Sequence, residues 1–203
     1  MSRIETIEDL RKIYKEATGR AAEKVISRLE KHSLRFIELS PFLVIATIGA
    51  DNLADVSPRG EKPGFVRALD DTTLAIPDRP GNNRLDTFSN LLVNPTVGLI
   101  FFIPGVDEVL RINGHAEIRD DEDLRNMFAV NGKLPATVLV VSLKEAYLHC
   151  AKAIMRAELW DERAKIDRAL LPTMGRMMKD QIGTDIPVES QEELVARHRS
   201  EFY

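Results

Sequence analysis

The spacing of apolar residues divides the chain into a β-rich centre and two helical ends. From Thr6 to about Ser33, apolar side chains recur at three- and four-residue intervals on either side of Gly19, which predicts two short helices. Thr6 followed by Asp9 resembles a capping box at the start of the first helix. Helical spacing returns after residue 160, where we expect helices at 164–171, 172–181 and 191–202.

The centre of the chain consists of short runs of β-branched and other apolar residues separated by turn-forming residues, a pattern typical of β-strands. These runs lie at 42–48, 54–57, 65–69, 73–76, 96–103, 108–118 and 136–148, with short helical patterns at 84–92 and 121–130. Strand follows strand without a regular βαβ alternation, which indicates antiparallel pairing. We therefore expect a mainly β (α+β) fold: a six-stranded antiparallel barrel with peripheral N- and C-terminal helices.

The length of the chain, 203 residues, suits one sizeable core and does not require a second domain. Hydrophobic residues make up 44% and charged residues 30%, as in an ordinary globular protein. We expect a single domain over residues 1–203, with a helical extension at about 1–38, a barrel at about 40–160 and a helical tail at about 161–203.

Charge and cysteine content exclude several classes of function. The net charge of −4 argues against nucleic acid as a partner, because binding to a polyanion depends on clustered positive charge. The single cysteine, Cys150, excludes an internal disulfide framework, and the four histidines show no metal-ligand spacing, so we expect no metal site. Without a signal peptide or an apolar run long enough for a membrane span, the sequence predicts a cytoplasmic protein that does not bind membranes.

Arginine and small polar residues gather at two points where a predicted strand gives way to a loop. The two segments contribute Ser57, Arg59, Arg79, Asn82, Asn83 and Arg84. Guanidinium groups combined with neutral donors suit a phosphate, and Asn83 is placed to cap a helix whose dipole would add to an anion site. The alternative is that these arginines are solvated loop residues and that the Pro-Gly-Asn-Asn sequence is merely a turn.

The order of these motifs resembles the FMN-binding split barrels related to pyridoxamine 5'-phosphate oxidase, over about residues 36–160. The motifs are Val56-Ser57-Pro58-Arg59, then Pro77-Asp78-Arg79-Pro80-Gly81-Asn82-Asn83-Arg84, Asn94-Pro95 and Leu110-Arg111-Ile112-Asn113-Gly114. The resemblance implies FMN as cofactor, held at the interface of a homodimer. It places Val56, Ser57 and Pro58 beside the flavin ring, and Arg59, Asn82, Asn83 and Arg84 at the phosphate, with Pro77, Asp78 and Arg79 in the same loop.

Three later residues resemble positions near the flavin in this group of proteins, and Trp160 is a further candidate for contact with the ring. The resemblance implies that Arg111 approaches the flavin of the neighbouring subunit, although a solvated arginine on a strand fits the sequence equally well. Lys152 and Arg156 have the i, i+4 spacing that puts two cations on one helix face. Trp160, the only tryptophan, would cover the flavin ring or pack in the core.

The sequence departs from the oxidase proper in ways that put its substrate in doubt. The Ser-Arg-Lys signature is replaced by Asn83-Arg84, and the arginine-rich carboxyl-terminal strand that recognises pyridoxamine phosphate is missing. We therefore expect an FMN-dependent oxidoreductase that acts on an unidentified small molecule or a nicotinamide cofactor. The alternatives are a non-catalytic flavin store or sensor, a split barrel that binds haem or a deazaflavin, and a purely structural barrel.

Overall fold

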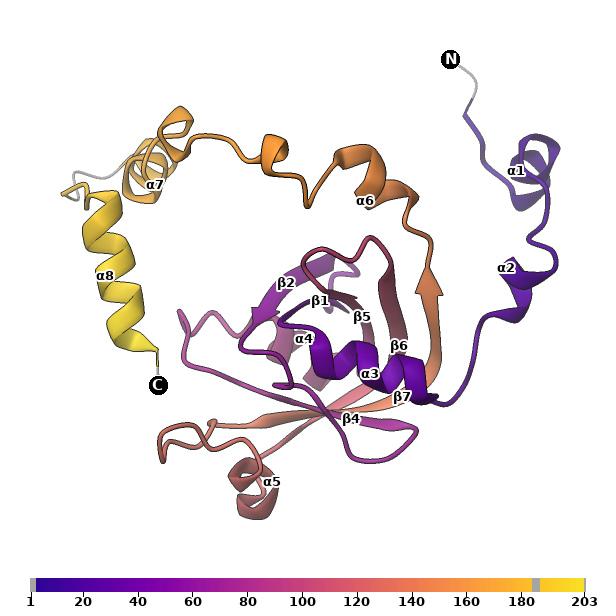
Figure 1. Ribbon diagram of the computed structural model, residues 1–203, viewed down its shortest axis with the longest axis horizontal. Coiled ribbons are helices and arrows are strands. Elements are labelled where there is room, and N and C mark those ends of the chain that lie inside the picture. The colour runs from indigo at the N-terminus through magenta and orange to yellow at the C-terminus, as the bar shows by residue number, and fades with distance from the viewer. Residues whose placement is uncertain (1–2, 184–186, 203) are drawn as a thin grey trace.

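A curled, fully antiparallel sheet forms the centre of the computed structural model, which describes residues 3–183 and 187–202 (Figure 1). Residues 1–2, 184–186 and 203, which the predicted domain includes, lie outside the described residues. The strand order is β2-β1-β5-β6-β7-β4-β3. The strands are β1 (Phe42–Ile48), β2 (Ala54–Gly60), β3 (Arg67–Ala68), β4 (Thr73–Pro77), β5 (Thr96–Phe102), β6 (Val109–Arg119) and β7 (Val138–His149).

The predicted fold class is confirmed: the structure is a mainly β, antiparallel barrel with helices at its periphery. Seven strands are present in the described residues instead of six, because the two-residue β3 pairs with β4. The helices are α1 (Ile7–Ile13), α2 (Arg20–Glu23), α3 (Lys31–Leu39), α4 (Asp86–Val93), α5 (Glu122–Asn126), α6 (Lys152–Ala157), α7 (Met174–Ile182) and α8 (Gln191–Glu201).

Alternation along the strands builds the core. In β1, Leu43 and Ile45 are buried whereas their neighbours are partly or fully exposed, and in β5 the buried residues are Leu99 and Phe101. Because side chains on a strand alternate between faces, these residues line the inside of the barrel. They belong to one cluster of buried residues that extends to α3 and α4.

The sheet does not close into a complete barrel. Among the described residues β2 pairs only with β1, and β4 pairs with β7 on one side and with the short β3 on the other. Ile76 and Pro77 at the end of β4 therefore have no strand partner on the side away from β7. This split leaves one edge of β2 and the end of β4 available to line a site.

The amino-terminal helices differ from those that the spacing predicts. The second expected helix is reduced to α2, because Ile26 pairs with Ala146 of β7 through two backbone hydrogen bonds of 2.9 and 2.8 Å. Pairing with the sheet thus replaces a helical turn. The sequence prediction also missed α3, which begins after Glu30, whose carboxylate accepts hydrogen bonds from the backbone N–H groups of His32 and Ser33. Phe36 and Ile37 anchor α3 in the core.

The carboxyl-terminal tail follows the prediction for two helices and departs from it for one. The expected helix at 164–171 is replaced by two 3₁₀ turns, Glu162–Ala164 and Arg168–Leu170, each capped by the aspartate before it. Asp161 and Asp167 accept backbone hydrogen bonds from residues two positions ahead, which favours a turn over a continuous helix. Ser190 forms the predicted capping box with Glu193 at the start of α8.

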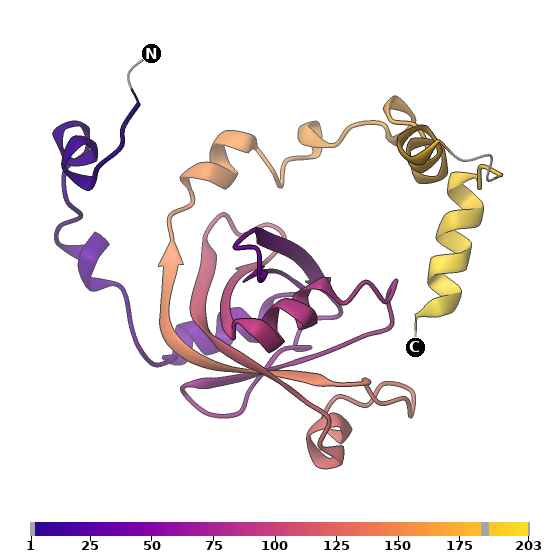
Figure 2. The same ribbon diagram turned by 180° about the vertical axis from the view of Figure 1, so that it is seen from behind.

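Both ends of the chain extend away from the barrel, as the two opposite views show (Figure 1, Figure 2). We call residues 3–25 the amino-terminal arm and residues 158–183 and 187–202 the carboxyl-terminal arm. Neither arm contains a buried residue. Within the described ranges, no helix has the length and apolar character that crossing a membrane requires.

Candidate functional site

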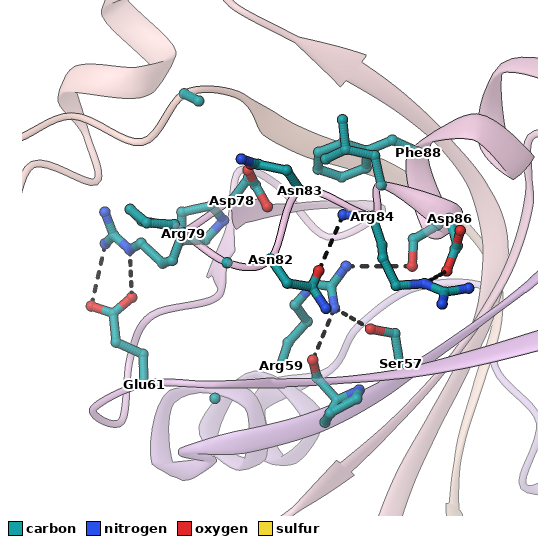
Figure 3. Close-up of a pocket in the computed structure, with 18 of the residues that line it drawn as sticks. Ser57, Arg59, Glu61, Asp78, Arg79, Asn82, Asn83, Arg84, Asp86 and Phe88 are labelled. Atoms are coloured by element: carbon teal, nitrogen blue, oxygen red, sulfur yellow. Dashed lines mark hydrogen bonds and ion pairs between the residues drawn. The ribbon is translucent and has the colours of Figure 1, made fainter. Parts of the chain in front are cut away.

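A cavity of about 640 Å³ lies in the split of the barrel (Figure 3). Most of its wall comes from β2, the end of β4, the loop between β4 and α4, and the first turn of α4. Phe65, Leu134 and Ala136 complete the wall. The residues predicted from the two arginine-containing segments all line it: Val56, Ser57, Pro58, Arg59, Pro77, Asp78, Arg79, Asn82, Asn83 and Arg84. The structure thus brings together two segments that are about twenty positions apart in the sequence.

Strand β2 directs alternate side chains into this cavity. Ser57 and Arg59 are half-buried, whereas Val56, Pro58 and Gly60 between and beyond them are exposed. Ser57 pairs with Ile45 of β1, which is buried, so Ser57 and Arg59 share the inner face of the sheet.

Arg59 is the central cation of the cavity. Its guanidinium donates hydrogen bonds to the Ser57 hydroxyl, to the Pro58 carbonyl oxygen at 2.9 Å and to the Thr87 hydroxyl at 3.4 Å. It forms no salt bridge with any carboxylate in the described part of the chain. Burial lowers the pKa of Arg59, and the charges of Asp78 and Asp55 partly offset this. A half-buried guanidinium with neutral partners only is suited to bind an anion.

The first turn of α4 supplies a second feature that favours an anion. Leu85, the residue before the helix, has left-handed backbone angles (φ 57°, ψ 22°), and no side chain caps the helix. The N–H groups of the first turn therefore keep their capacity to bind a ligand, and the helix dipole favours negative charge there. Arg59 reaches the same turn through Thr87, whose side chain is buried.

The loop before α4 is held by a local turn. Asn82 accepts a hydrogen bond on Oδ1 from the Arg84 backbone N–H at 3.1 Å, and Asn83 adopts a positive φ of 58°. Asparagine tolerates this conformation better than most residues. Asn83 therefore shapes the loop and does not cap the helix, since the position before α4 belongs to Leu85.

The other arginines of the cavity are paired with carboxylates. Arg79 binds Glu61 through Nε–Oε2 at 2.8 Å and Nη2–Oε1 at 3.2 Å, and the two side chains are only 17% and 11% exposed. Arg84 pairs with Asp86 at 2.7 Å, but these side chains are 75% and 46% exposed. An exposed pair of this kind contributes little to stability and is easily exchanged for a ligand.

Asp78, at the start of the loop after β4, is a further carboxylate that lines the cavity, as is Asp55 of β2. Burial raises the pKa of Asp78, while the charges of Arg59 and Arg79 act in the opposite direction. Its backbone N–H donates to Thr137 at 2.9 Å, which extends the pairing of β4 with β7 by one residue. This backbone bond holds Asp78 at the wall of the cavity.

The four later candidates do not line this cavity in the described chain. Arg111 lies in one row across the sheet with Pro58, Val44 and Ile100. Three strand-to-strand steps of about 4.8 Å each separate Arg111 from Pro58, so the two residues lie ~14 Å apart. Both are on the outer face of the sheet. Its guanidinium lies 5.2 Å from the ring centre of Tyr147.

Two cations, Lys24 and Arg111, lie over the ring of Tyr147. The ammonium of Lys24 lies 5.0 Å from the Tyr147 ring centre, and neither Lys24 nor Arg111 forms a salt bridge with a described carboxylate. Lys152 and Arg156 are both in α6, as their spacing predicts. Trp160 donates its indole N–H to the Val106 carbonyl oxygen at 2.9 Å and so fixes the start of the carboxyl-terminal arm to the β5–β6 loop.

Several residues that line the cavity were not predicted from the sequence, among them Asp55, Glu61, Asp86, Thr87 and Phe88. Thr87 had a signal, because a threonine in the first turn of a predicted helix has a hydroxyl placed to serve an anion site. No sequence signal marks Glu61, because its pairing with Arg79 depends on the tertiary arrangement of two strands that are distant in the sequence. Among the described residues, no group of three or more His, Cys, Asp or Glu side chains is arranged to hold a metal ion.

Comparison with known proteins identifies the family. The family model described as pyridoxamine 5'-phosphate oxidase matches residues 29–150, which is more than half of the chain. No curated protein matches the chain. The solved structure of a histidine-to-alanine variant of HupZ from Group A Streptococcus is 17% identical, with a TM-score of 0.50, and the alignment covers 59% of this chain and 98% of that protein. General Stress Protein 26 of Bacillus anthracis is also 17% identical, with a TM-score of 0.43. That alignment covers 56% of this chain and 88% of the stress protein. At these identities the HupZ likeness shows the fold alone.

The left-handed conformation of Leu85 leads to a prediction about stability. A leucine in this conformation costs about 1–2 kcal/mol, and its 52% exposed side chain packs little, so Leu85→Gly should leave the free energy of unfolding unchanged or raise it by up to ~1 kcal/mol. The matched change Leu92→Gly, at an 81% exposed helical position, should lower it by ~1 kcal/mol. Urea unfolding measures both, and an equal loss in the two variants would show that Leu85 is not strained.

Proposed function

We propose that this chain, which belongs to the pyridoxamine 5'-phosphate oxidase family, binds FMN with its phosphate between Arg59 and the first turn of α4. The observation that carries the proposal is the half-buried Arg59 guanidinium, which has no carboxylate partner among the described residues and reaches a helix start without a side-chain cap. The cavity volume lies within the range of small-molecule sites. The residues present therefore fit a phosphate-bearing ligand of this size.

The flavin ring would lie along β2. One edge of this strand has no strand partner in the described chain, so its backbone groups at Val56, Ser57 and Pro58 can face a planar ligand. When bound, FMN supplies hydride and electron transfer at its ring, which is chemistry the protein need not perform itself. The chain contributes orientation, hydrogen bonds from Ser57 and the positive charge of Arg59.

The proposed activity is an FMN-dependent oxidoreduction of a small molecule or a nicotinamide cofactor. Steady turnover with a reductant distinguishes an enzyme from a flavin store or sensor. The absorbance spectrum of the purified protein distinguishes FMN from haem and from a deazaflavin. Haem is disfavoured because none of the four histidines lines the cavity, and an axial ligand would have to come from elsewhere.

A homodimer with the flavin at its interface is the second part of the proposal. Both arms lack buried residues, and α7 exposes Met174, Met178 and Ile182 by 48%, 46% and 57% along one face. Helices this short are only marginally stable without tertiary packing, so the arms need a further surface to pack against. The cation cluster around Arg111 and Tyr147 lies on the outer face of the sheet, where a second chain's flavin could reach it.

Loss of FMN is the expected result of removing the central cation. Arg59→Ala deletes charge-assisted hydrogen bonds worth about 1.5–3 kcal/mol, so the Kd for FMN should rise roughly 10- to 100-fold. Arg28→Ala removes an arginine whose exposed partner is Asp71, away from the cavity, and should bind FMN normally. Titration followed by flavin fluorescence measures both, and unchanged binding by the Arg59 variant would refute the proposed phosphate site.

Dimerisation through the arms predicts a defined effect of charge on α7. Placing glutamate at both Met174 and Met178 puts two carboxylates on the apolar face and should shift the protein toward one chain, because an apolar interface excludes unpaired charge. Light scattering should give twice the 22.9 kDa chain mass for the parent protein and for the control Arg176→Glu, which makes the same change of two charge units on the opposite face of α7. A double variant that keeps the dimeric mass would place the interface elsewhere.

A further inference from the structure

The pairing of Glu61 with Arg79 gives the cavity an end wall of a particular charge. Glu61 follows β2 directly, and its backbone N–H donates to the Pro41 carbonyl oxygen at 3.0 Å, which continues the pairing with β1. The alternation of half-buried residues therefore runs from Ser57 through Arg59 to Glu61. Side chains two positions apart on a strand are ~7 Å apart, so Glu61 stands beyond Arg59 along the cavity floor.

Glu61 and Arg79 neutralise each other, so neither side chain offers a free charge to a ligand. Both carboxylate oxygens of Glu61 bind the Arg79 guanidinium, at 2.8 and 3.2 Å, and both side chains are largely buried. The close-up shows this pair at one end of the site, and Arg59 nearer to Asn82 and Ser57 (Figure 3). Breaking a buried pair leaves an uncompensated charge, so a ligand cannot easily separate the two groups.

The pair also bridges the split of the barrel. Glu61 extends β2, and Arg79 follows the end of β4, the two elements that no backbone ladder joins in the described chain. The ion pair therefore fixes the distance between the walls at this end. A ligand that extends past Arg59 in this direction meets a rigid, electrically neutral wall.

We propose that the Glu61–Arg79 pair makes the site selective for a phosphate monoester and against a diphosphate, and hence for FMN against FAD. The inference rests on the proposed function, which places the flavin ring along Val56 to Pro58 and the phosphate at Arg59. A second phosphate would lie toward Glu61, where Arg79 is already neutralised. That phosphate would lose water without gaining an ionic partner. Glu61 is thus a specificity-determining residue.

Binding of FMN and FAD to the full-length protein tests the inference through their ratio. The parent chain should bind FMN at least about tenfold more tightly than FAD. Glu61→Gln leaves one oxygen to accept from Arg79 but removes the negative charge, so the ratio should move toward FAD by roughly tenfold. Glu61→Asp keeps the carboxylate and should keep the preference for FMN.

A matched control and three outcomes complete the experiment. Glu38→Gln removes a carboxylate from the exposed Arg35–Glu38 pair, which does not line the cavity, and should leave the ratio unchanged. Equal affinity of the parent protein for FMN and FAD overturns the inference and leaves the proposed function standing, whether or not the variants fold. If Glu61→Gln has the same FMN-to-FAD affinity ratio as the parent protein, the inference is also overturned and the proposed function still stands. Failure of the parent protein to bind either flavin overturns both.

Discussion

Hydrogen bonding across the sheet stops at β2, and the candidate site depends on that interruption. A closed barrel would pair the free edge of β2 with β4 and fill the space between them with side chains. Here the described β4 ends at Pro77, and the chain turns into a loop that returns as α4. The cavity occupies the gap, so the same feature that leaves backbone groups unpaired also exposes them to a ligand.

The electrostatics of the site depend on which of its arginines forms an ion pair with a carboxylate. Burial disfavours the charged forms of Arg59 and Asp78, which lowers the pKa of Arg59 and raises that of Asp78. Arg79 is compensated by Glu61, whereas the hydrogen-bond partners of Arg59 in the described part of the chain are hydroxyl and carbonyl oxygens. A bound phosphate would supply the missing negative charge. The uncapped start of α4 adds a second reason for an anion to bind at the same place.

The sequence predicted the strands and the cavity-lining segments better than it predicted their partners. Strand positions and the grouping of Ser57, Arg59 and Asn82 to Arg84 could be read from β-branched runs and from the resemblance to the family. The short length of α2 could not, because pairing of Ile26 with Ala146 overrides local spacing. The start of α3 was missed because a glutamate, Glu30, caps it. The Glu61–Arg79 pair joins residues 18 positions apart across the split, and no local pattern marks such a contact.

The most direct test of the account is a crystal structure of the protein grown with FMN. The account predicts the phosphate within hydrogen-bonding distance of the Arg59 guanidinium and of backbone N–H groups in the first turn of α4, with the ring along Val56 to Pro58. A flavin whose phosphate lies outside this cavity, or bound with Arg59 turned away from it, would contradict the account.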